Sequence, residues 1–304
     1  MLPTPADVIA AAYRLRPVVS RTPLVRSSAL SERASADVYL KCENLQRTGS
    51  FKLRGAYNAL ATMSASERAR GVVASSAGNH GLGIALAAQM LGVRLRVFVP
   101  STAPAVKRDG IRALGADVDE TPPHYDAAHE TALAYASAHD MTFVSPCAGE
   151  PLLAGQGTIA LEILEELPSL GTVVIPFGGG GLAAGIATLL RAAAPSVRII
   201  GVQSDRTNAL AVALEAGRIV EIEVPATLAD GLSGQVDETG LALGKFALDE
   251  VRVVTEDQVA EAIRFIAREH DMTVEGSGAV SVASILSGNI AAPAGPVVLI
   301  LSGA

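Results

Sequence analysis

Apolar and polar positions alternate along the chain in a way that predicts short buried strands separated by helices. Runs rich in apolar and β-branched residues are typical of strands buried on both faces, and they lie at 71–75, 94–100, 171–176, 197–203, 251–254 and 297–301. Segments with helical patterning lie at 4–15, 51–63, 82–91, 105–114, 155–167, 182–194, 207–216, 256–270 and 278–286. This strand–helix alternation predicts an α/β fold with parallel sheet covered by helices on both faces.

Local signals support several helix boundaries. Thr4 followed by Pro5 is typical of a helix start, and Gly92 is typical of a helix end. Thr255 with Gln258 three residues later forms a capping-box pattern. Residues 22–25 are expected to be extended because a residue before proline avoids the helical region, and residues 37–42 alternate like a strand.

Composition narrows the class of protein. The chain has 304 residues, 49% of them apolar, which is enough for a large core. The net charge of −7 makes nucleic acid and anionic membrane surfaces poor partners. With two cysteines, no signal-peptide pattern and no apolar run of transmembrane length, the sequence predicts a cytoplasmic protein.

A turn-forming Thr-Gly-Ser precedes Lys52 at the start of a predicted helix. Ser50 is expected to be the N-cap, which places Lys52 in the first helical turn. There the helix dipole lowers the pKa of the ammonium, and such an amine can form a Schiff base with an aldehyde cofactor. Taken alone, Lys52 is also compatible with an ordinary surface lysine.

Four glycines, Gly178, Gly179, Gly180 and Gly181, stand between a predicted strand and a predicted helix. Their unobstructed N–H groups at a helix N-terminus suit a phosphate monoester. A dinucleotide fingerprint is the rival interpretation, but it requires an acidic residue at the end of the next strand. That strand ends in Gln203, so a phosphate cofactor is favoured over NAD.

The polar turn at 76–81 follows another predicted strand, at the sheet edge where ligands bind in α/β folds. Asn79 can hydrogen-bond a phenolate oxygen, and the turn backbone can hold a carboxylate. His80 is more typical of a structural histidine than of a catalyst. The four other histidines lack metal-ligand spacing, and we expect no metal site.

Together these segments resemble one family. The motifs are TGSFKLRGA (48–56), SAGNHG (76–81), AGQGT (154–158), PFGGGGL (176–182), ADG (229–231), VEGSGA (274–279) and LSG (301–303). They resemble the pyridoxal-phosphate enzymes of the tryptophan-synthase β-chain fold, in the serine/threonine dehydratase and serine racemase branch. The resemblance implies fold type II, with two open parallel, doubly wound sheets. It also implies a large domain of 1–70 plus 147–304 and a small domain of 71–146.

The resemblance assigns roles to individual residues. Pyridoxal 5′-phosphate would be linked to Lys52, and its phosphate held by the four glycines and the Leu182 N–H. Phe51 would pack against the ring, Asn79 would bind its 3′-oxygen, and Ser302 would face its nitrogen. Glu275 would lie near the ring. The substrate carboxylate would be surrounded by Ser76, Ala77, Gly78, Asn79, His80 and Gln156.

Three departures from the family pattern affect this interpretation. Ala77 replaces the serine that reprotonates the far face of Cα in serine racemases, so elimination is expected rather than racemization. Gln203 replaces a glutamate among the divalent-cation ligands of that branch, and an amide binds hard cations less well. Ala304 replaces the family's second glycine after Ser-Gly, and no C-terminal regulatory module is expected.

The sequence therefore predicts a lyase that removes water and ammonia from a small β-hydroxy-α-amino acid such as threonine or serine. An amino-acid racemase, a dehydratase for a hydroxyaspartate or phenylserine-type substrate, and a binding protein without chemistry remain alternatives. We expect a homodimer or homotetramer, with a small amino acid as the substrate and neither nucleic acid nor a membrane as partner.

Overall fold

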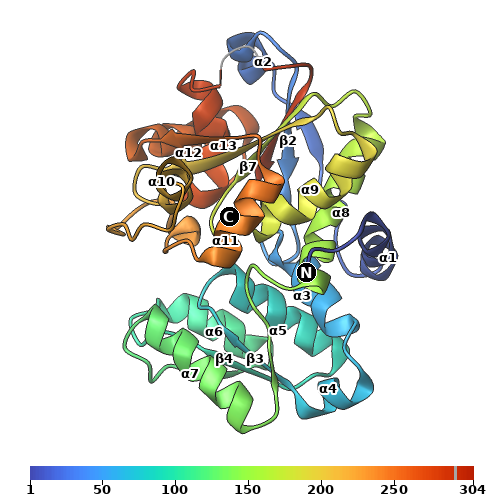
Figure 1. Ribbon diagram of the computed structural model, residues 1–304, viewed down its shortest axis with the longest axis vertical. Helices are drawn as coiled ribbons and strands as arrows, with labels where there is room; N and C mark the ends of the chain where they lie inside the picture. Colours follow the sequence, from blue (N-terminus) through green and yellow to red (C-terminus); the bar gives the residue numbers. More distant parts are fainter. Residues whose placement is uncertain (291–292) are drawn as a thin grey trace.

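The computed structural model describes residues 1–290 and 293–304, and its strands form two sheets (Figure 1). The six-stranded sheet has the order β1 (Leu24–Arg26), β2 (Val38–Cys42), β10 (Val297–Leu301), β7 (Thr172–Pro176), β8 (Arg198–Ser204) and β9 (Glu250–Val254). The four-stranded sheet has the order β5 (Asp117–Asp119), β4 (Leu95–Phe98), β3 (Val72–Ser75) and β6 (Thr142–Phe143). Every pairing is parallel except that of β1 with β2.

Helices connect the strands, as the alternating pattern predicts. They are α1 (Pro5–Leu15), α2 (Ser28–Ala34), α3 (Lys52–Ala61), α4 (Ala65–Arg70), α5 (Asn79–Leu91), α6 (Ala105–Ala113), α7 (Tyr125–Ala138), α8 (Glu150–Glu166), α9 (Gly181–Ala193), α10 (Ala209–Ala216), α11 (Glu238–Ala247), α12 (Glu256–His270) and α13 (Gly276–Leu286), with short 3₁₀ turns η1 (Glu43–Leu45) and η2 (Asp230–Leu232). None of the described helices is long and apolar enough to cross a membrane.

The six-stranded sheet has an apolar core on each face. Successive residues of one strand belong to different cores, because successive side chains in a strand point to opposite faces. Val174 in β7 packs with residues of α12 and α13, whereas the preceding Val173 packs with residues of α8 and α9. The expectation of parallel strands buried on both faces is therefore confirmed for this sheet.

Two helices begin three or more residues earlier than the sequence pattern predicts. The predicted start of α8 is Gly155, but the helix begins at Glu150 and runs through that glycine. The predicted start of α5 is Leu82, but its first residue is Asn79. In both cases, glycine residues that are typical of turns lie inside the helix, where they allow close contact with other backbone.

The two sheets are separate along the chain, since residues 72–143 supply all four strands of the smaller one. Helix α3 links them. Its Leu53 and Ala56 belong to the apolar core that contains Val72 and Ala74 of the smaller sheet, although residues 1–70 are assigned to the large domain by the sequence. The boundaries of the two domains therefore stay a prediction.

Candidate active site

Lys52 is the first residue of α3. This helix lies at the junction of the two parts of the molecule (Figure 1). The prediction that Ser50 caps this helix is wrong. The N-cap position is Phe51, and no side chain among the described residues caps the helix. Ser50 is instead fully buried and pairs with Gly303 in an isolated antiparallel bridge. The bridge draws Ser50 toward the end of β10, one residue before the cap.

The Lys52 ammonium lies in a desolvated environment. Its Nζ donates a hydrogen bond of 2.8 Å to the carbonyl oxygen of Pro146, and it lies 5.1 Å from the centre of the Phe51 ring. Burial lowers the pKa of Lys52, while the nearby Cys147 and Glu275 act in the opposite direction. The expected direction of the pKa shift is thus reproduced, with burial as its main cause.

The loop 76–80 lies beside Lys52 because α5 packs closely against the start of α3. A Cβ added to Gly83 would lie 3.0 Å from both the Leu53 nitrogen and the Lys52 carbonyl carbon, so only glycine fits there without displacement. Asn79, the first residue of α5, donates a hydrogen bond of 2.8 Å from Nδ2 to Glu275 Oε1. The structure therefore brings together Lys52, Asn79 and Glu275, as the sequence predicts.

Glu275 is the N-cap residue of α13, and its carboxylate points toward Asn79. The backbone N–H of Glu275 donates to the Gly303 oxygen at 3.1 Å, and Ser302 accepts a hydrogen bond of 3.2 Å from the Phe51 N–H. The end of β10 thus lies between Lys52 and Glu275. Burial, helped by the nearby Asp230, raises the pKa of Glu275 to about 7.

His80 is buried, with Nε2 lying 3.2 Å from the carbonyl oxygen of Val144. Because a carbonyl only accepts, Nε2 carries the proton and Nδ1 is left as an acceptor. Burial, with a further contribution from the Lys52 charge, lowers the pKa of His80 to about 3. The ring is therefore neutral at physiological pH, which supports a structural or hydrogen-bonding role over acid catalysis.

The glycine loop forms the opposite wall of this site. Gly180 has φ +88°, in the left-handed region, and α9 begins at Gly181. A Cβ added to Gly179 would lie 2.7 Å from Cys147 Sγ, and one added to Gly181 would lie 2.5 Å from the Cys147 carbonyl oxygen. Cys147 therefore packs against the loop, whose N–H groups at a helix N-terminus suit a phosphate, and the buried Leu182 is the next residue of α9.

The segment 145–149 is a part of the site that sequence reasoning misses. Pro146 accepts the Lys52 hydrogen bond, and Cys147 lies against the glycine loop. Ser145 Oγ accepts hydrogen bonds from the N–H groups of Cys147 and Ala148, which shapes the turn. One sequence signal could have revealed this segment: it lies only a few residues before the AGQGT motif in the chain, so it must lead directly into α8.

Gln156 lies well inside α8 instead of near the start of that helix, where the sequence places it. Its side chain is buried between α3 and α9: a Cβ added to Gly55 would lie 2.4 Å from Gln156 Nε2, and one added to Gly185 would lie 2.8 Å from Gln156 Cβ. Neither amide atom of Gln156 has a hydrogen-bond partner among the described residues. The hydrogen-bonding capacity of its amide is therefore unused within these residues.

Buried polar atoms without partners gather in the segments that form the site. Within residues 1–290 and 293–304, they include Thr48 Oγ1, Ser50 Oγ, His80 Nδ1 and both amide atoms of Gln156. Such atoms are costly unless water or a ligand satisfies them. Together with the glycine cradle and the desolvated lysine amine, they fit a polar aldehyde that carries a phosphate.

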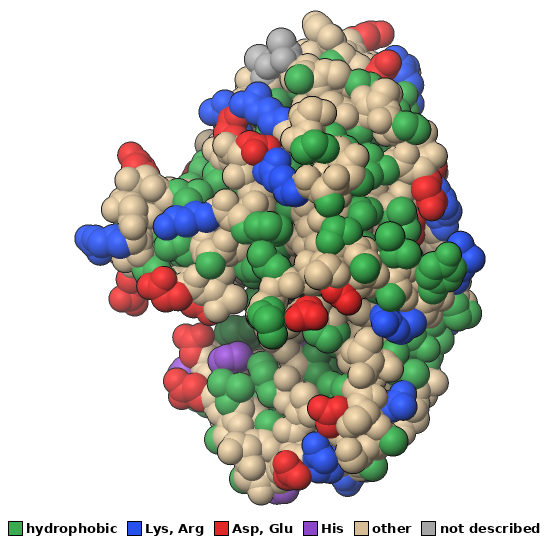
Figure 2. All heavy atoms as spheres, turned by 45° about the vertical axis from the view of Figure 1, so that its right-hand side comes forward, with side chains coloured by type: hydrophobic (Ala, Val, Ile, Leu, Met, Phe, Trp, Pro, Cys, Tyr) green, Lys and Arg blue, Asp and Glu red, His purple; other side chains and the backbone are tan. Residues whose placement is uncertain are grey.

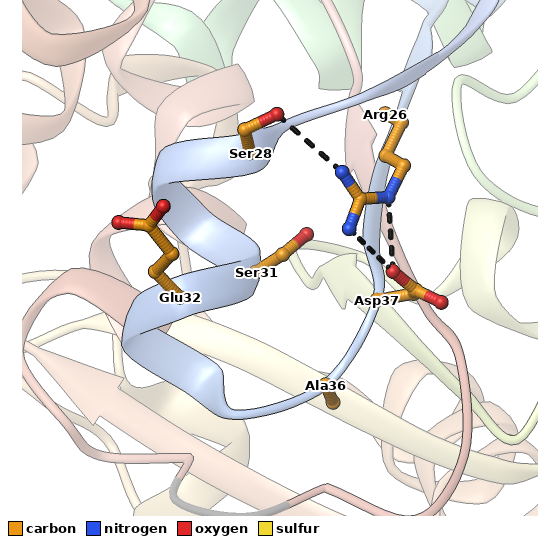
Figure 3. Close-up of a pocket in the computed structure, with 6 residues that line it drawn as sticks. All are labelled: Arg26, Ser28, Ser31, Glu32, Ala36 and Asp37. Atoms are coloured by element: carbon orange, nitrogen blue, oxygen red, sulfur yellow. Dashed lines mark hydrogen bonds and ion pairs between the residues drawn. The ribbon is translucent and has the colours of Figure 1, made fainter.

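The surface is hollowed between the larger and smaller parts of the molecule, with acidic and histidine side chains at the rim (Figure 2). A second hollow lies elsewhere and is lined by Arg26, Ser28, Ser31, Glu32, Ala36 and Asp37 (Figure 3). There Arg26 makes an ion pair with Asp37 at 2.7 Å, and none of the residues predicted for the active site takes part. We therefore place the active site at Lys52 and not in the second hollow.

The position expected for a cation ligand is occupied by a hydrogen-bonded amide. Gln203 is buried, and its Nε2 donates to the carbonyl oxygens of Phe177 at 3.2 Å and Thr207 at 2.8 Å. Its Oε1 accepts from the Ala211 N–H at 3.0 Å. Across the described part of the chain, no group of three or more His, Cys, Asp or Glu side chains could hold a metal ion.

A desolvated lysine amine, a glycine-lined helix N-terminus and a carboxyl group with a raised pKa, placed between two α/β sheets, define an enzyme that uses a phosphate-bearing aldehyde cofactor. Residues 15–303 match the model of the family described as pyridoxal-phosphate dependent enzyme. The chain belongs to this family, and its cofactor is pyridoxal phosphate.

Relatives with known names agree with this assignment. The chain is 43% identical over 282 residues to an L-threonine ammonia-lyase from Thermotoga maritima, covering 92% of this chain and 70% of the relative. It resembles the structure of maize serine racemase with a TM-score of 0.95 at 28% identity, covering 100% of this chain and 94% of the other. The structure of threonine deaminase isoform 2 from Solanum lycopersicum gives a TM-score of 0.90 at 35% identity, covering 98% of this chain and 83% of the other.

These similarities confirm the fold type II architecture and the expected class of enzyme, a pyridoxal-phosphate-dependent lyase.

Proposed function

We propose that this enzyme eliminates water from threonine or serine, and that hydrolysis of the eliminated product takes up one water again and releases ammonia and a 2-oxo acid. One observation carries the proposal: the half-buried Lys52 amine lies on one side of the site, while loop position 77, where a second proton-transfer group would be needed, is an alanine. Elimination needs a base on one face of Cα, whereas inversion needs groups on both. Similarity to a threonine ammonia-lyase supports the same reaction.

Several residues would hold the cofactor. When bound, pyridoxal phosphate supplies an aldehyde for the amines and an electron sink for the Cα carbanion. Its phosphate would lie on the N–H groups of Gly178, Gly179, Gly180, Gly181 and Leu182. Phe51 would pack against the ring and Ser302 would face the ring nitrogen. Asn79 has a second amide N–H besides the one given to Glu275, and this donor would bind the ring oxygen.

The substrate carboxylate would be held by the loop Ser76, Ala77, Gly78, Asn79 and His80 together with Gln156. The loop ends at the N-terminus of α5, where free N–H groups favour an anion. The unpartnered amide of Gln156 offers a further donor. His80 Nδ1, which only accepts, would take a hydrogen bond from an amine and not contact the carboxylate oxygens directly.

Proton movement would depend on Lys52 and Glu275. The Lys52 amine, whose pKa is lowered by burial, would remove the Cα proton. Glu275, with a pKa of about 7, would exchange a proton with groups near the ring at neutral pH. The carboxyl groups of Glu275 and Asp230 would repel a second substrate carboxylate, which favours threonine or serine over a hydroxyaspartate.

The experiment is a substrate panel assayed for release of 2-oxo acid in the presence of pyridoxal phosphate. It includes L-threonine, L-serine, a hydroxyaspartate and a phenylserine, with Lys52→Ala as the control variant. We expect product from threonine or serine with the parent enzyme and none with Lys52→Ala, which also loses the visible absorbance of the lysine-bound cofactor. Turnover by Lys52→Ala, or racemization without 2-oxo acid, would contradict the proposal.

We further propose that no divalent cation takes part. The buried amide of Gln203 already joins Phe177, Thr207 and Ala211 through hydrogen bonds, the kind of link that a bound cation would otherwise make. Treatment with EDTA is therefore expected to leave 2-oxo acid release unchanged. A loss of activity that returns on adding Mg²⁺ or Ca²⁺ would show that a cation site exists elsewhere.

We also propose that the enzyme is a cytoplasmic homodimer or homotetramer. Ile9 and Tyr13 lie four residues apart on α1 and are 45% and 65% exposed, so one face of this helix leaves apolar surface for a second copy. Both cysteines are free, as is usual in a reducing compartment. Light scattering of the purified enzyme tests the oligomeric state, and cell fractionation tests the compartment.

A further inference from the structure

A cluster of four charged side chains is buried behind Lys52, and the proposed chemistry does not use it. Arg54, in the first turn of α3, lies between two carboxylates. Its guanidinium donates to Glu43 from Nε and Nη2, both at 2.8 Å, and to Glu162 from Nη1 at 2.6 Å and Nη2 at 3.0 Å. A fifth bond of 3.2 Å reaches Thr158, so all five N–H donors are used.

Lys41 completes this cluster. Its Nζ donates to Glu162 Oε2 and to the carbonyl oxygen of Thr22, each at 2.6 Å. Lys41, Glu43 and Arg54 are fully buried, and the Glu162 side chain is 14% exposed. Two positive and two negative charges balance, so the cluster carries no net charge.

The members of the cluster come from elements that do not adjoin in the chain. Lys41 belongs to β2, Glu43 to η1, Arg54 to α3 and Glu162 to α8. The cluster therefore ties the start of α3 both to the six-stranded sheet and to α8. Buried ion pairs often add little stability compared with apolar side chains of similar size, so stability alone is a weak reason for such a cluster.

Backbone contacts of Ser50 and Phe51 with Gly303 and Ser302 hold the residues before α3, and the start of the helix itself needs a further anchor. No side chain of the described chain caps this helix, although its first residue is Lys52. Two residues after Lys52, the Arg54 guanidinium makes two hydrogen bonds to each of two carboxylates, an arrangement called here the double fork. A bidentate guanidinium has a defined geometry, so the double fork fixes both the rotation of the helix and the position of its first turn.

We propose that Arg54 is a positioning residue, which holds Lys52 in the orientation needed for its reaction through the double fork to Glu43 and Glu162. The proposal rests on the proposed role of Lys52. Arg54 itself touches neither the substrate nor the cofactor, and its contacts are with Glu43, Glu162 and Thr158.

The test separates positioning from stability with three variants. Arg54→Met leaves an unbalanced carboxylate, so it also destabilises the fold. The double variant Arg54→Met/Glu43→Gln restores charge balance, because Lys41 then pairs with Glu162. Arg54→Lys keeps the charge but cannot form the double fork. Arg96→Met is the matched control, since Arg96 bridges Asp117 at 2.9 Å and Asp119 at 2.7 Å within the smaller sheet.

Three readouts are taken on the loaded enzymes well below their melting temperatures. These are the circular dichroism band of the lysine-bound cofactor, amide hydrogen exchange in peptide 50–58, and kcat and KM. We expect the double variant and Arg54→Lys to change the band, to exchange faster in that peptide, and to lower kcat roughly tenfold or more with a smaller change in KM. Arg96→Met should match the parent in all three.

If the double variant and Arg54→Lys both keep the circular dichroism band, the hydrogen-exchange rate and the kcat of the parent, the proposal is overturned. The cluster would then be structural only. If the parent itself shows a normal cofactor band but releases no 2-oxo acid, the proposed function fails while the band and the exchange still test the role of Arg54.

Discussion

At the scale of single residues, the surroundings set which groups can exchange protons near neutral pH. Burial lowers the pKa of His80 to about 3, which keeps the ring neutral, and it raises the pKa of Glu275 to about 7. Burial also lowers the pKa of Lys52. A carboxyl group that titrates near pH 7 and an amine that is easier to deprotonate suit acid–base chemistry.

The raised pKa of Glu275 makes stability depend on pH. The folded chain binds this proton more tightly than the unfolded chain, whose pKa is near 4.5, so stability is full below that pH and falls as pH rises to about 7. A shift of this size corresponds to about 3 kcal/mol. Glu275→Gln cannot titrate, and we expect it to lack this loss and to be more stable than the parent at pH 8.

Urea unfolding of the cofactor-free chain at pH 5 and pH 8 measures this difference. Glu256 is the control position: its pKa is lowered, so Glu256→Gln should leave the loss between these pH values intact. If the stability of the parent and of Glu275→Gln depends on pH to the same extent, Glu275 does not have the raised pKa assigned to it.

The choice between elimination and racemization belongs to residue 77. Inversion of Cα needs a proton donor opposite Lys52, and the half-buried Ala77 has no hydroxyl to act as one. We expect the parent to convert L-threonine or L-serine with little epimerised substrate, and Ala77→Ser to raise the epimerised fraction. Chiral chromatography of the residual substrate measures this, and rapid epimerisation by the parent would refute the argument.

At the scale of elements, glycines let three helices meet with their backbones in contact. A Cβ added to Gly155 in α8 would lie 2.5 Å from the Arg54 oxygen in α3, and one added to Gly157 would lie 2.7 Å from the Gly185 oxygen in α9. Helix α8 therefore sits directly between the helix that begins at Lys52 and the helix that begins at the glycine loop. The AGQGT motif serves this packing as well as placing Gln156.

The glycine loop supports a matched pair of substitutions. Gly180 and Gly217 both have positive φ, +88° and +70°, so a valine is strained at either position. Only at Gly180 does the added Cβ meet neighbouring atoms, Leu243 Cβ and Phe177 Cζ at 3.0 Å, whereas none lies within 4 Å at Gly217. We expect Gly180→Val to weaken pyridoxal phosphate binding at least tenfold and Gly217→Val to leave it unchanged.

Absorbance titration with pyridoxal phosphate measures the affinity of both variants. If the two bind the cofactor equally well, the glycine loop does not hold the phosphate.

At the scale of the whole molecule, the site depends on the crossing from the smaller sheet back to the larger one. The segment 145–149 passes between Lys52 and the glycine loop, which places Cys147 where cofactor binding would cover it. Cys42 is buried in the core of the larger sheet, and burial raises the pKa of its thiol to about 12. The two free cysteines therefore report on different parts of the fold.

We expect iodoacetamide to label Cys147 in the cofactor-free enzyme and to label it at least tenfold more slowly once pyridoxal phosphate is bound, because a covered thiolate cannot attack the reagent. Cys42 should stay unlabelled in both states and serves as the internal control. Mass spectrometry of the tryptic peptides gives both rates. If Cys147 is labelled at the same rate with and without pyridoxal phosphate, the cofactor binds elsewhere.

Much of the fold follows from the sequence because it depends on local pattern. Apolar β-branched runs predict β3, β7, β8 and β10 within a residue or two, and the Thr255 capping box marks the start of α12. Elements with weak patterns, such as the polar α4 and the short β6, are not predicted individually. The starts of α5 and α8 are misplaced because glycine has two uses, as a turn residue and as a contact residue inside helices.

The sequence by itself determined the class of fold, and it predicted Lys52 as the Schiff-base lysine and the glycine loop as the phosphate site, since these signals depend on residues that adjoin in the chain. Tertiary structure alone decided that Ser50 pairs with Gly303, that Cys147 lies against Gly179, and that Arg54 holds two carboxylates from other elements. It also decided the pKa shifts of His80 and Glu275, and it made burial the main cause of the lowered pKa of Lys52. Burial and long-range contacts exist only after packing, and the pKa of a side chain responds to them more than to its neighbours in sequence.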